Sequence, residues 1–582
     1  MKNLLTLISI VAIGACSSSV VKHESALGSI PLQSCEAIQT FVLKDLDSYQ
    51  DRIDKIARDY QIEQWKVEAA DPKASSEKMS ELFAQQQKVV YDQEILKNAL
   101  AVFEASKNLS EQDCPLKTKM PRIKQLLETT ILMNDAVVKK EKENQDKQDA
   151  LISKSNAYRI QLPDEKEPVS KAIYAKKMGA IKDRSQREKL YKAYNSGRSQ
   201  KWTEWNFKEL VKSRNEEGRL AGFKNYYEYR FFRSQLNLEN YLNLVKEIKT
   251  KLAPRAAAAL KQLAKKEGLS KVEGWDMRFL REKSASGEIN EYLKEIPETA
   301  ALEIARKFYR ELGIEIDSYH FQMDLYPRSG KNTHAFAMGV MLPRVDAKAN
   351  LIAEPKMDIR FLANLKKPVV WSDVSTVIHE LGHAIHFGEV RQPIAALRGI
   401  GSVETEAIAM TTERMAGSEE FLRTILPEYV KATPKELAQV LKKHVEAQKL
   451  EQAFVLLRQA YFSDFEHEVY LNPDQDLAKL WSKMHQEWWG VDIAPEYVDW
   501  DVDHFVMAPI YVQNYAIGLI MVQQFYQSIQ KEFKTSYRSK PLGDKLKKIY
   551  FAPGIEWDYL ELTRKFTGKP LTAEAALGLL PK

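Results

Sequence analysis

A five-residue segment, His-Glu-Leu-Gly-His from His379 to His383, constrains the fold of this chain more than any other stretch. Histidines four residues apart share one face of an α-helix, so both imidazoles can reach one Zn²⁺ ion. Glu380 then lies beside the metal, where a carboxylate can take a proton from metal-bound water. Apolar residues from Val374 to Ile378 offer a buried face, and Ser372-Asp373 can cap the start of the helix.

A catalytic zinc ion needs a third protein ligand and one open coordination position. Three glutamates downstream, Glu404, Glu406 and Glu413, are candidates. Glu404 and Glu406 are two positions apart and face differently on a helix, so only one of them can bind the metal. Glu413 shares the face of Glu406 and suits a carboxylate that supports a histidine ligand through a hydrogen bond. Glu404 and Glu413 equally fit a plain surface.

The rest of the chain favours helix. Gly and Pro are scarce, 23 and 22 among 582 residues, and Lys, Glu, Gln, Ala and Leu dominate. Long antiparallel helices are expected in residues 35–150 and again from Asp373 onward, with a loop at Glu282–Gly287. Alternation broken by Gly and Pro predicts a small sheet within Tyr319–Leu342. The length predicts several domains or one large multi-lobed helical body.

The charge pattern argues against a nucleic-acid partner. The formal net charge is +6 and no basic block with interleaved aromatic residues stands out. Apolar and aromatic residues, 44% and 10% of the chain by overlapping counts, are plentiful enough to form a large core.

The N-terminal sequence has the pattern of a targeting segment. Lys2 precedes an apolar stretch from Leu4 to Ile13, which is too short to span a bilayer and fits a secretory signal in residues 1–15. Ile13-Gly14-Ala15-Cys16 resembles a bacterial lipobox, which implies lipidation of Cys16, a tether in residues 16–34 and a place on the bacterial cell envelope, facing the periplasm or the exterior. The alternative is an ordinary cleaved signal with an incidental cysteine. No other stretch approaches the length of a membrane span, so lipid is the only anchor expected.

Two cysteines remain after Cys16 is set aside. Cys35 and Cys114 form an even pair in a chain that would enter an oxidising compartment, so a disulfide between them is a reasonable hypothesis. Two buried free thiols are the alternative.

Longer motifs resemble known zinc peptidases. His-Glu-Leu-Gly-His-Ala-Ile-His, ending at His386, resembles the core motif of the thimet oligopeptidase and oligoendopeptidase F family. Glu406–Glu413 is similar to the third-ligand helix of that family. Leu397-Arg398-Gly399 and Glu406-Ala407-Ile408 also resemble the related peptidyl-dipeptidase A (angiotensin-converting enzyme) family. The resemblance implies His379, His383 and Glu406 as zinc ligands, and a mostly α, two-lobed helical gluzincin fold with a deep central cleft and a small β-sheet near the active site.

A second similar segment concerns substrate. Asp324–Lys331, followed by His334-Ala335-Phe336-Ala337, resembles a segment of the oligopeptidases in which the following strand pairs with the peptide backbone. The resemblance implies that His334 approaches the scissile bond while Ala335 and Ala337 supply main-chain hydrogen bonds. A strand added in this way is recognised through its main-chain hydrogen bonds and depends little on the identity of its side chains.

A third similar segment supplies candidate hydrogen-bond donors. Asp503-His504-Phe505 and Pro509–Gly518 resemble a conserved stretch of oligoendopeptidase F, which implies that His504 and Tyr515, with Tyr511 as a third candidate, stabilise the oxyanion of the tetrahedral intermediate. This chain has Gln513 where that family usually has another Tyr. Phe462–Glu468 also resembles a family helix, but no chemistry is assigned to it.

Together these patterns predict a monomeric, lipid-anchored zinc oligopeptidase that cleaves short peptides, with residues 35–150 as an N-terminal helical region and residues 151–582 as the catalytic region. A peptidyl-dipeptidase that releases C-terminal dipeptides is one alternative. In the peptidyl-dipeptidase A family a Lys precedes the matching histidine by two residues, but here that position is Val502, which favours an internal cut. A catalytically silent envelope-binding protein is the other alternative, and the intact Glu380 argues against it.

Overall fold

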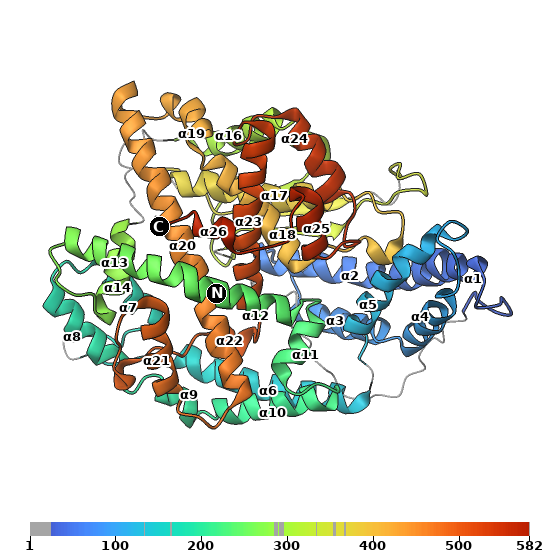
Figure 1. Ribbon diagram of the computed structural model, residues 1–582, viewed down its shortest axis with the longest axis horizontal. Helices are drawn as coiled ribbons and strands as arrows, with labels where there is room; N and C mark the ends of the chain where they lie inside the picture. The colour runs from blue at the N-terminus through green and yellow to red at the C-terminus, as the bar shows by residue number, and fades with distance from the viewer. Residues whose placement is uncertain are drawn as a thin grey trace.

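The structure, a computed structural model, describes residues 25–132, 134–162, 166–284, 289, 296–332, 334–352, 357–365 and 368–580. The described chain is mostly α-helical with one three-stranded sheet, which confirms the predicted fold class (Figure 1). The expected signal peptide, Cys16, part of the tether and part of the Glu282–Gly287 loop lie outside the described residues. No helix in the described part of the chain is long and apolar enough to cross a membrane.

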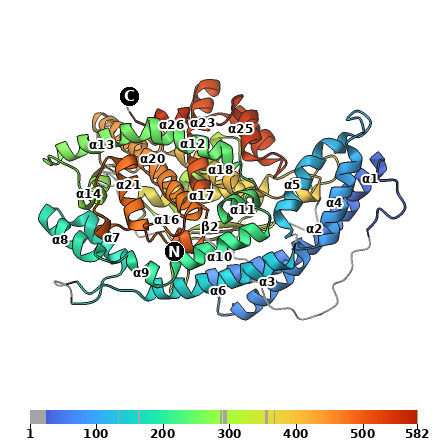
Figure 2. The same ribbon diagram turned by 60° about the horizontal axis from the view of Figure 1, so that its bottom comes forward.

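The first five helices form a second, smaller hydrophobic core, which Ile394 and Leu397 from the catalytic region also enter. They are α1 (Cys35–Thr40), α2 (Leu46–Glu68), α3 (Ser76–Val90), α4 (Gln93–Ser106) and α5 (Met120–Thr130). Buried Phe41, Ile95 and Ile123 lie in this core, which extends to Ile131. A disulfide joins Cys35 to Cys114, with their Cα atoms 5.4 Å apart. Figures 1 and 2 both show these helices gathered at one end of the molecule.

The remaining helices surround one large core. The helix α6 (Asp135–Ala157) runs through residue 150, the expected regional boundary, and its buried Val137 and Leu151 belong to this larger core. The other helices are α7 (Lys171–Ala180), α8 (Arg184–Asn195), α9 (Gln200–Glu204), α10 (Phe207–Leu220), α11 (Tyr226–Arg233), α12 (Leu238–Glu247), α13 (Ala253–Lys266), α14 (Gly274–Ser284), α16 (Glu298–Glu311), α17 (Trp371–Gly388), α18 (Ser402–Ala416), α19 (Glu419–Ile425), α20 (Pro434–Leu471), α21 (Leu477–Trp489), α22 (His504–Met507), α23 (Val512–Phe533), α24 (Lys540–Lys545), α25 (Tyr559–Thr567) and α26 (Glu574–Leu577).

Local sequence accounts for the starts of α17 and α20, two helices that contribute to the site. In α20, the Thr433 hydroxyl accepts a hydrogen bond from the Glu436 N–H, and the Glu436 carboxylate accepts one from the Thr433 N–H, so the first turn is capped reciprocally. The helix α17 begins at Trp371, and Asp373 contributes from inside its first turn by accepting from the Val370 N–H at 3.0 Å.

The small sheet has the order β1-β3-β2. Its strands are β1 (Gln322–Asp324), β2 (Phe336–Met341) and β3 (Asp358–Leu362), with β3 parallel to β1 and antiparallel to β2. The small sheet predicted within Tyr319–Leu342 contains β1 and β2, but the sequence did not predict β3, which lies between them. Because β3 occupies one side of β2, the other edge of β2 is left for a different partner.

Candidate active site

The close packing of α17 against α18 builds the centre of the site. Val374, Val377 and Leu381 on α17 are fully buried, which fixes how the helix is rotated. At Gly382 an added Cβ would lie 2.7 Å from the Thr412 hydroxyl oxygen and 3.1 Å from the Ala409 Cα, both on α18. The glycine of the His-Glu-Leu-Gly-His segment therefore permits the short approach that brings the two helices together.

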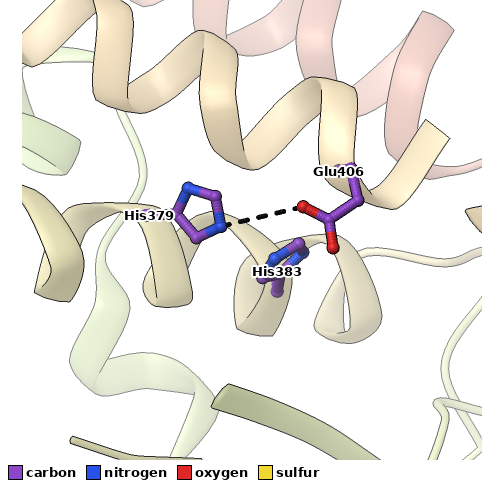
Figure 3. Close-up of side chains that lie close together, drawn as sticks. All are labelled: His379, His383 and Glu406. Atoms are coloured by element: carbon purple, nitrogen blue, oxygen red, sulfur yellow. Dashed lines mark ion pairs between the residues drawn. The ribbon is translucent and has the colours of Figure 1, made fainter. Parts of the chain in front are cut away.

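This packing brings His379, His383 and Glu406 to one point. Their candidate ligand atoms all lie within 4.8 Å of one another, and His379 Nε2 is 4.0 Å from Glu406 Oε2. Figure 3 shows Glu406 reaching from its helix toward the two histidine rings on the facing helix. Neighbouring donors around a tetrahedral zinc ion are about 3.4 Å apart, so small side-chain rotations would close the set. Two imidazoles and a carboxylate fit zinc and leave one position open, as in catalytic sites.

Hydrogen bonds on the far side of each ring orient the histidines. Glu413 Oε2 lies 3.2 Å from His379 Nδ1, and Ser375 Oγ donates to the other Glu413 oxygen at 2.9 Å. Thr405 Oγ1 lies 3.1 Å from His383 Nδ1. Both rings thus keep Nε2 for a metal. Glu413 occupies the supporting position expected for it, whereas Thr405 was missed because a hydroxyl beside a ligand carries no distinctive spacing.

The charges around His379 favour a cation. Burial lowers the pKa of the His379 imidazole, but the hydrogen bond to Glu413 and the negative charges of Glu380, Glu413 and Glu406 outweigh it and raise the pKa to about 9. The negative charges of Glu380, Glu406 and Glu413 thus favour a positive charge at His379. A divalent cation bound there would take the place of the proton on this imidazole.

Glu380 is the general-base candidate, and it is 7% exposed. Burial raises the pKa of its carboxyl to about 7; the charge of His379 and the N–H of Ala337 act in the opposite direction. A base with a pKa near neutral is suited to accept and return a proton. The contact with Ala337 also places the carboxyl against the open edge of β2.

A cavity of about 590 Å³ contains the histidines, Glu380 and Glu406. Ala335 and Ala337 line it, whereas His334 is exposed at the start of the same segment, where its N–H donates to Asn332 Oδ1. The size suits a short stretch of peptide.

The N-terminal region also lines this cavity, through residues of α2 and α6. Turned so that both donors are satisfied, the Gln61 amide of α2 donates to the carbonyls of Gly339 (2.9 Å) and Val340 (3.2 Å). Trp65 packs edge-on against Phe336, with ring centroids 5.8 Å apart. The helix α2 therefore contacts β2 at Phe336 and at Gly339–Val340, while Ala335 to Gly339 line the cavity. The sequence alone assigned no role to this region.

The two tyrosines expected to donate hydrogen bonds line the cavity. Tyr511 and Tyr515 lie with ring centroids 5.4 Å apart, and burial followed by the charge of Glu406 raises the pKa of Tyr511 to about 12. Both phenols thus stay protonated at neutral pH and can donate. His504 is not among the described lining residues; its ring lies 6.1 Å from that of Tyr515 between centroids and is nearly perpendicular to it.

Two buried charged residues hold the segment that carries these donors. Arg214 of α10 donates to the carbonyls of Phe505 (2.9 Å) and Val506 (2.8 Å). Glu466 of α20 accepts from the N–H of Ile510 at 2.9 Å, where the chain adopts a left-handed conformation with φ +54°. Glu466 belongs to Phe462–Glu468, the stretch for which sequence offered no role. Only the packing of α10 and α20 reveals this function.

Comparisons with known proteins agree with this geometry. Residues 178–578 match the model of Peptidase family M3, well over half of the chain. Oligopeptidase A of Salmonella typhimurium (strain LT2) is 23% identical over 454 residues, which cover 67% of this chain and 65% of the relative. Oligopeptidase A of Haemophilus influenzae is 22% identical over 464 residues, covering 69% of this chain and 67% of the relative. The match thus spans somewhat less than two thirds of the Salmonella protein's length.

Solved structures share the fold. A solved structure of PZ peptidase A with an inhibitor aligns with a TM-score of 0.59 at 15% identity, covering 92% of this chain and 96% of the other. The resemblance stated from the motifs is confirmed by the family match. The chain belongs to Peptidase family M3.

Proposed function

We propose that this chain hydrolyses internal bonds of short peptides with a zinc ion held by His379, His383 and Glu406. One observation carries the proposal: a single cavity contains this three-donor set, the buried Glu380 and the open edge of β2. When bound, zinc supplies Lewis acidity that activates water and polarises the scissile carbonyl. The enclosing wall from α2 and α6 favours short, unfolded peptides over folded proteins.

The protein side chains then have separate tasks. As the oxygen of water bonds to the carbonyl carbon, Glu380 takes the proton, and it returns that proton to the amine nitrogen when the carbon–nitrogen bond breaks. The phenol of Tyr515 donates to the carbonyl oxygen as negative charge develops there, with Tyr511 beside it. The backbone of Ala335 and Ala337 pairs with the peptide and sets its direction. His504, whose ring lies edge-on to that of Tyr515, is a further candidate donor to the same oxygen.

The test uses Glu380→Gln, which keeps all three metal ligands and removes the base. We expect zinc content to remain at one per chain while hydrolysis of a quenched peptide falls about 10²- to 10⁴-fold. Glu446→Gln, an exposed substitution on α20, is the matched control. Near-normal turnover by Glu380→Gln with zinc bound would disprove the mechanism.

Mass spectrometry of a peptide-library digest decides where the chain cuts. An internal cut leaves C-terminal fragments of varied length, longer than two residues. Exclusive release of dipeptides would instead establish the peptidyl-dipeptidase alternative, and no cleavage by zinc-loaded protein would favour a silent binding protein.

We further propose that the chain is a monomer on the cell envelope, attached through lipid on Cys16. The sequence of residues 1–16 supports the anchor, and the pairing of Cys35 with Cys114 is consistent with an oxidising compartment. One chain supplies every residue of the proposed site, which is consistent with a monomer. Cys16→Ser should move the protein from the membrane to the soluble fraction; light scattering should give a single-chain mass, and failure of either result would refute that part.

A further inference from the structure

One end of the cavity carries charged residues that the proposed mechanism does not use. Among the described lining residues, the only arginines or lysines are Arg214 and Arg230. Arg214 is fully engaged: besides the carbonyls of Phe505 and Val506, its guanidinium donates to Gln148 Oε1 at 2.6 Å. It is 1% exposed. Arg214 is therefore committed to the fold and is not available to a ligand.

Arg230 of α11 differs from Arg214 in this respect. It is partly buried, and its Nε is enclosed without a hydrogen-bond partner. Within the described chain no hydrogen bond or ion pair of its guanidinium is found. A buried cation without a partner is costly, so an unpaired guanidinium lining a cavity is a candidate for pairing with a ligand.

The acidic neighbours do not take the place of a ligand. Glu217 is bonded to the Asn144 amide at 2.7 Å and Glu466 to the Ile510 N–H, while one Glu141 oxygen has no partner in the described chain. Burial raises the pKa of Glu141 to about 7 and that of Glu466 to about 8, although nearby arginines oppose it. Burial therefore weakens the negative charge of Glu141 and Glu466 beside Arg230.

We propose that Arg230 binds a carboxylate of the peptide substrate while the scissile bond lies at His379, Glu380 and His383. This inference rests on the proposed peptidase function and names the substrate class. A guanidinium matches a carboxylate through two parallel hydrogen bonds. The carboxylate can be the C-terminus or an acidic side chain, which share this chemistry. The sequence placed no cation in the cleft, because Val502 stands where the peptidyl-dipeptidase A family has a Lys. Arg230 supplies a cation from a different helix.

The location makes such a contact possible within one short peptide. Arg230 interacts electrostatically with Glu466, which holds Ile510 next to Tyr511, and the charge of Glu406 in turn acts on Tyr511. Arg230 and the metal ligands thus line the same cavity. An extended peptide, which advances about 3.3 Å per residue, can run along this shared cavity.

The experiment measures kcat and KM of zinc-loaded protein on matched quenched peptides. One set carries a free C-terminal acid or an amide, and a second set, amidated throughout, carries a single Glu or Gln at successive positions from the cut. Wild type is expected to favour one carboxylate position. Arg230→Gln should lower kcat/KM for that peptide about 10- to 100-fold, mainly through KM, with little change for the neutral peptide. Arg230→Lys should restore part of the preference, and Arg219→Gln, exposed on α10, is the control.

Each outcome has one meaning. Preference for the free acid over the amide identifies the C-terminus as the source, and preference for one Glu position identifies a side chain. Equal cleavage of all peptides by wild type, or an equal loss on neutral and acidic peptides in Arg230→Gln, overturns the inference while leaving the peptidase function intact. No cleavage of any peptide by wild type would instead refute the proposed function. Bound zinc, measured in every variant, excludes loss of the metal as the cause.

Discussion

The two sides of the cavity are built by different means. On the metal side, α17 and α18 follow each other closely in the chain, and the spacing of His379, His383 and Glu406 comes from the helical repeat and one close helix crossing. On the other side, the donor segment from His504 to Tyr515 is held by Arg214 and Glu466, which come from two distant helices. The first side places the reactive groups locally, whereas the second depends on long-range packing.

The largest expected effect tests the metal side. Glu406→Gln replaces a charged ligand by a neutral amide, so zinc affinity should drop and kcat/KM should fall at least about 10³-fold. Glu404→Gln, two positions earlier on α18, is the matched control: burial raises the pKa of Glu404 to about 7, and its carboxylate lies outside the ligand set. Zinc content and peptide hydrolysis are measured for both variants. If Glu404→Gln loses zinc while Glu406→Gln keeps it, the ligand assignment is reversed.

The next effect tests the donor segment. Tyr515→Phe removes one hydrogen-bond donor to the oxyanion, and kcat should fall about 10²- to 10³-fold with zinc content unchanged. Tyr511→Phe should cost less. If Tyr511→Phe proves the more damaging of the two, the assignment of the principal donor must be exchanged.

A smaller effect tests the long-range anchor. Glu466→Ala leaves the buried Ile510 N–H without an acceptor, so Tyr511 and Tyr515 lose their fixed position, and kcat should fall about tenfold with little change in metal binding. Glu466→Gln keeps an acceptor and should recover much of the activity. Glu468→Gln, on a different face of α20, serves as the control. Equal kcat in Glu466→Ala and wild type would show that the anchor does not act on the donors.

The smallest effect on catalysis concerns the small hydrophobic core of the N-terminal helices α1 to α5. Replacing Cys35 and Cys114 by serine should lower the free energy of unfolding of the N-terminal helices by about 2–4 kcal/mol, because the disulfide closes a long loop in the unfolded chain. Since α2 forms a wall of the cavity, KM should rise while kcat stays close to wild type. Denaturant unfolding measures the free energy of unfolding, and steady-state kinetics measures KM and kcat. An unchanged denaturation midpoint in the double serine variant would contradict the prediction.

Sequence reasoning succeeded where the chemistry depends on short spacing. Histidines four residues apart, and glutamates seven residues apart, can be assigned to helix faces without any tertiary contact. It failed where partners are remote. The strand β3 has only five residues, and its role in the sheet comes from pairing with β1 and β2.

The sequence by itself determined the mostly helical fold, the metal-binding segment and the candidate ligand helix, because helix periodicity is a local property of the chain. The tertiary structure alone decided that Gly382 lets α18 approach, that α2 walls the cleft, and that Arg214 serves the fold while Arg230 faces the cavity unpaired. The physical reason is that a charged side chain acquires its role from its partners, and partners hundreds of residues away are chosen by packing, not by spacing.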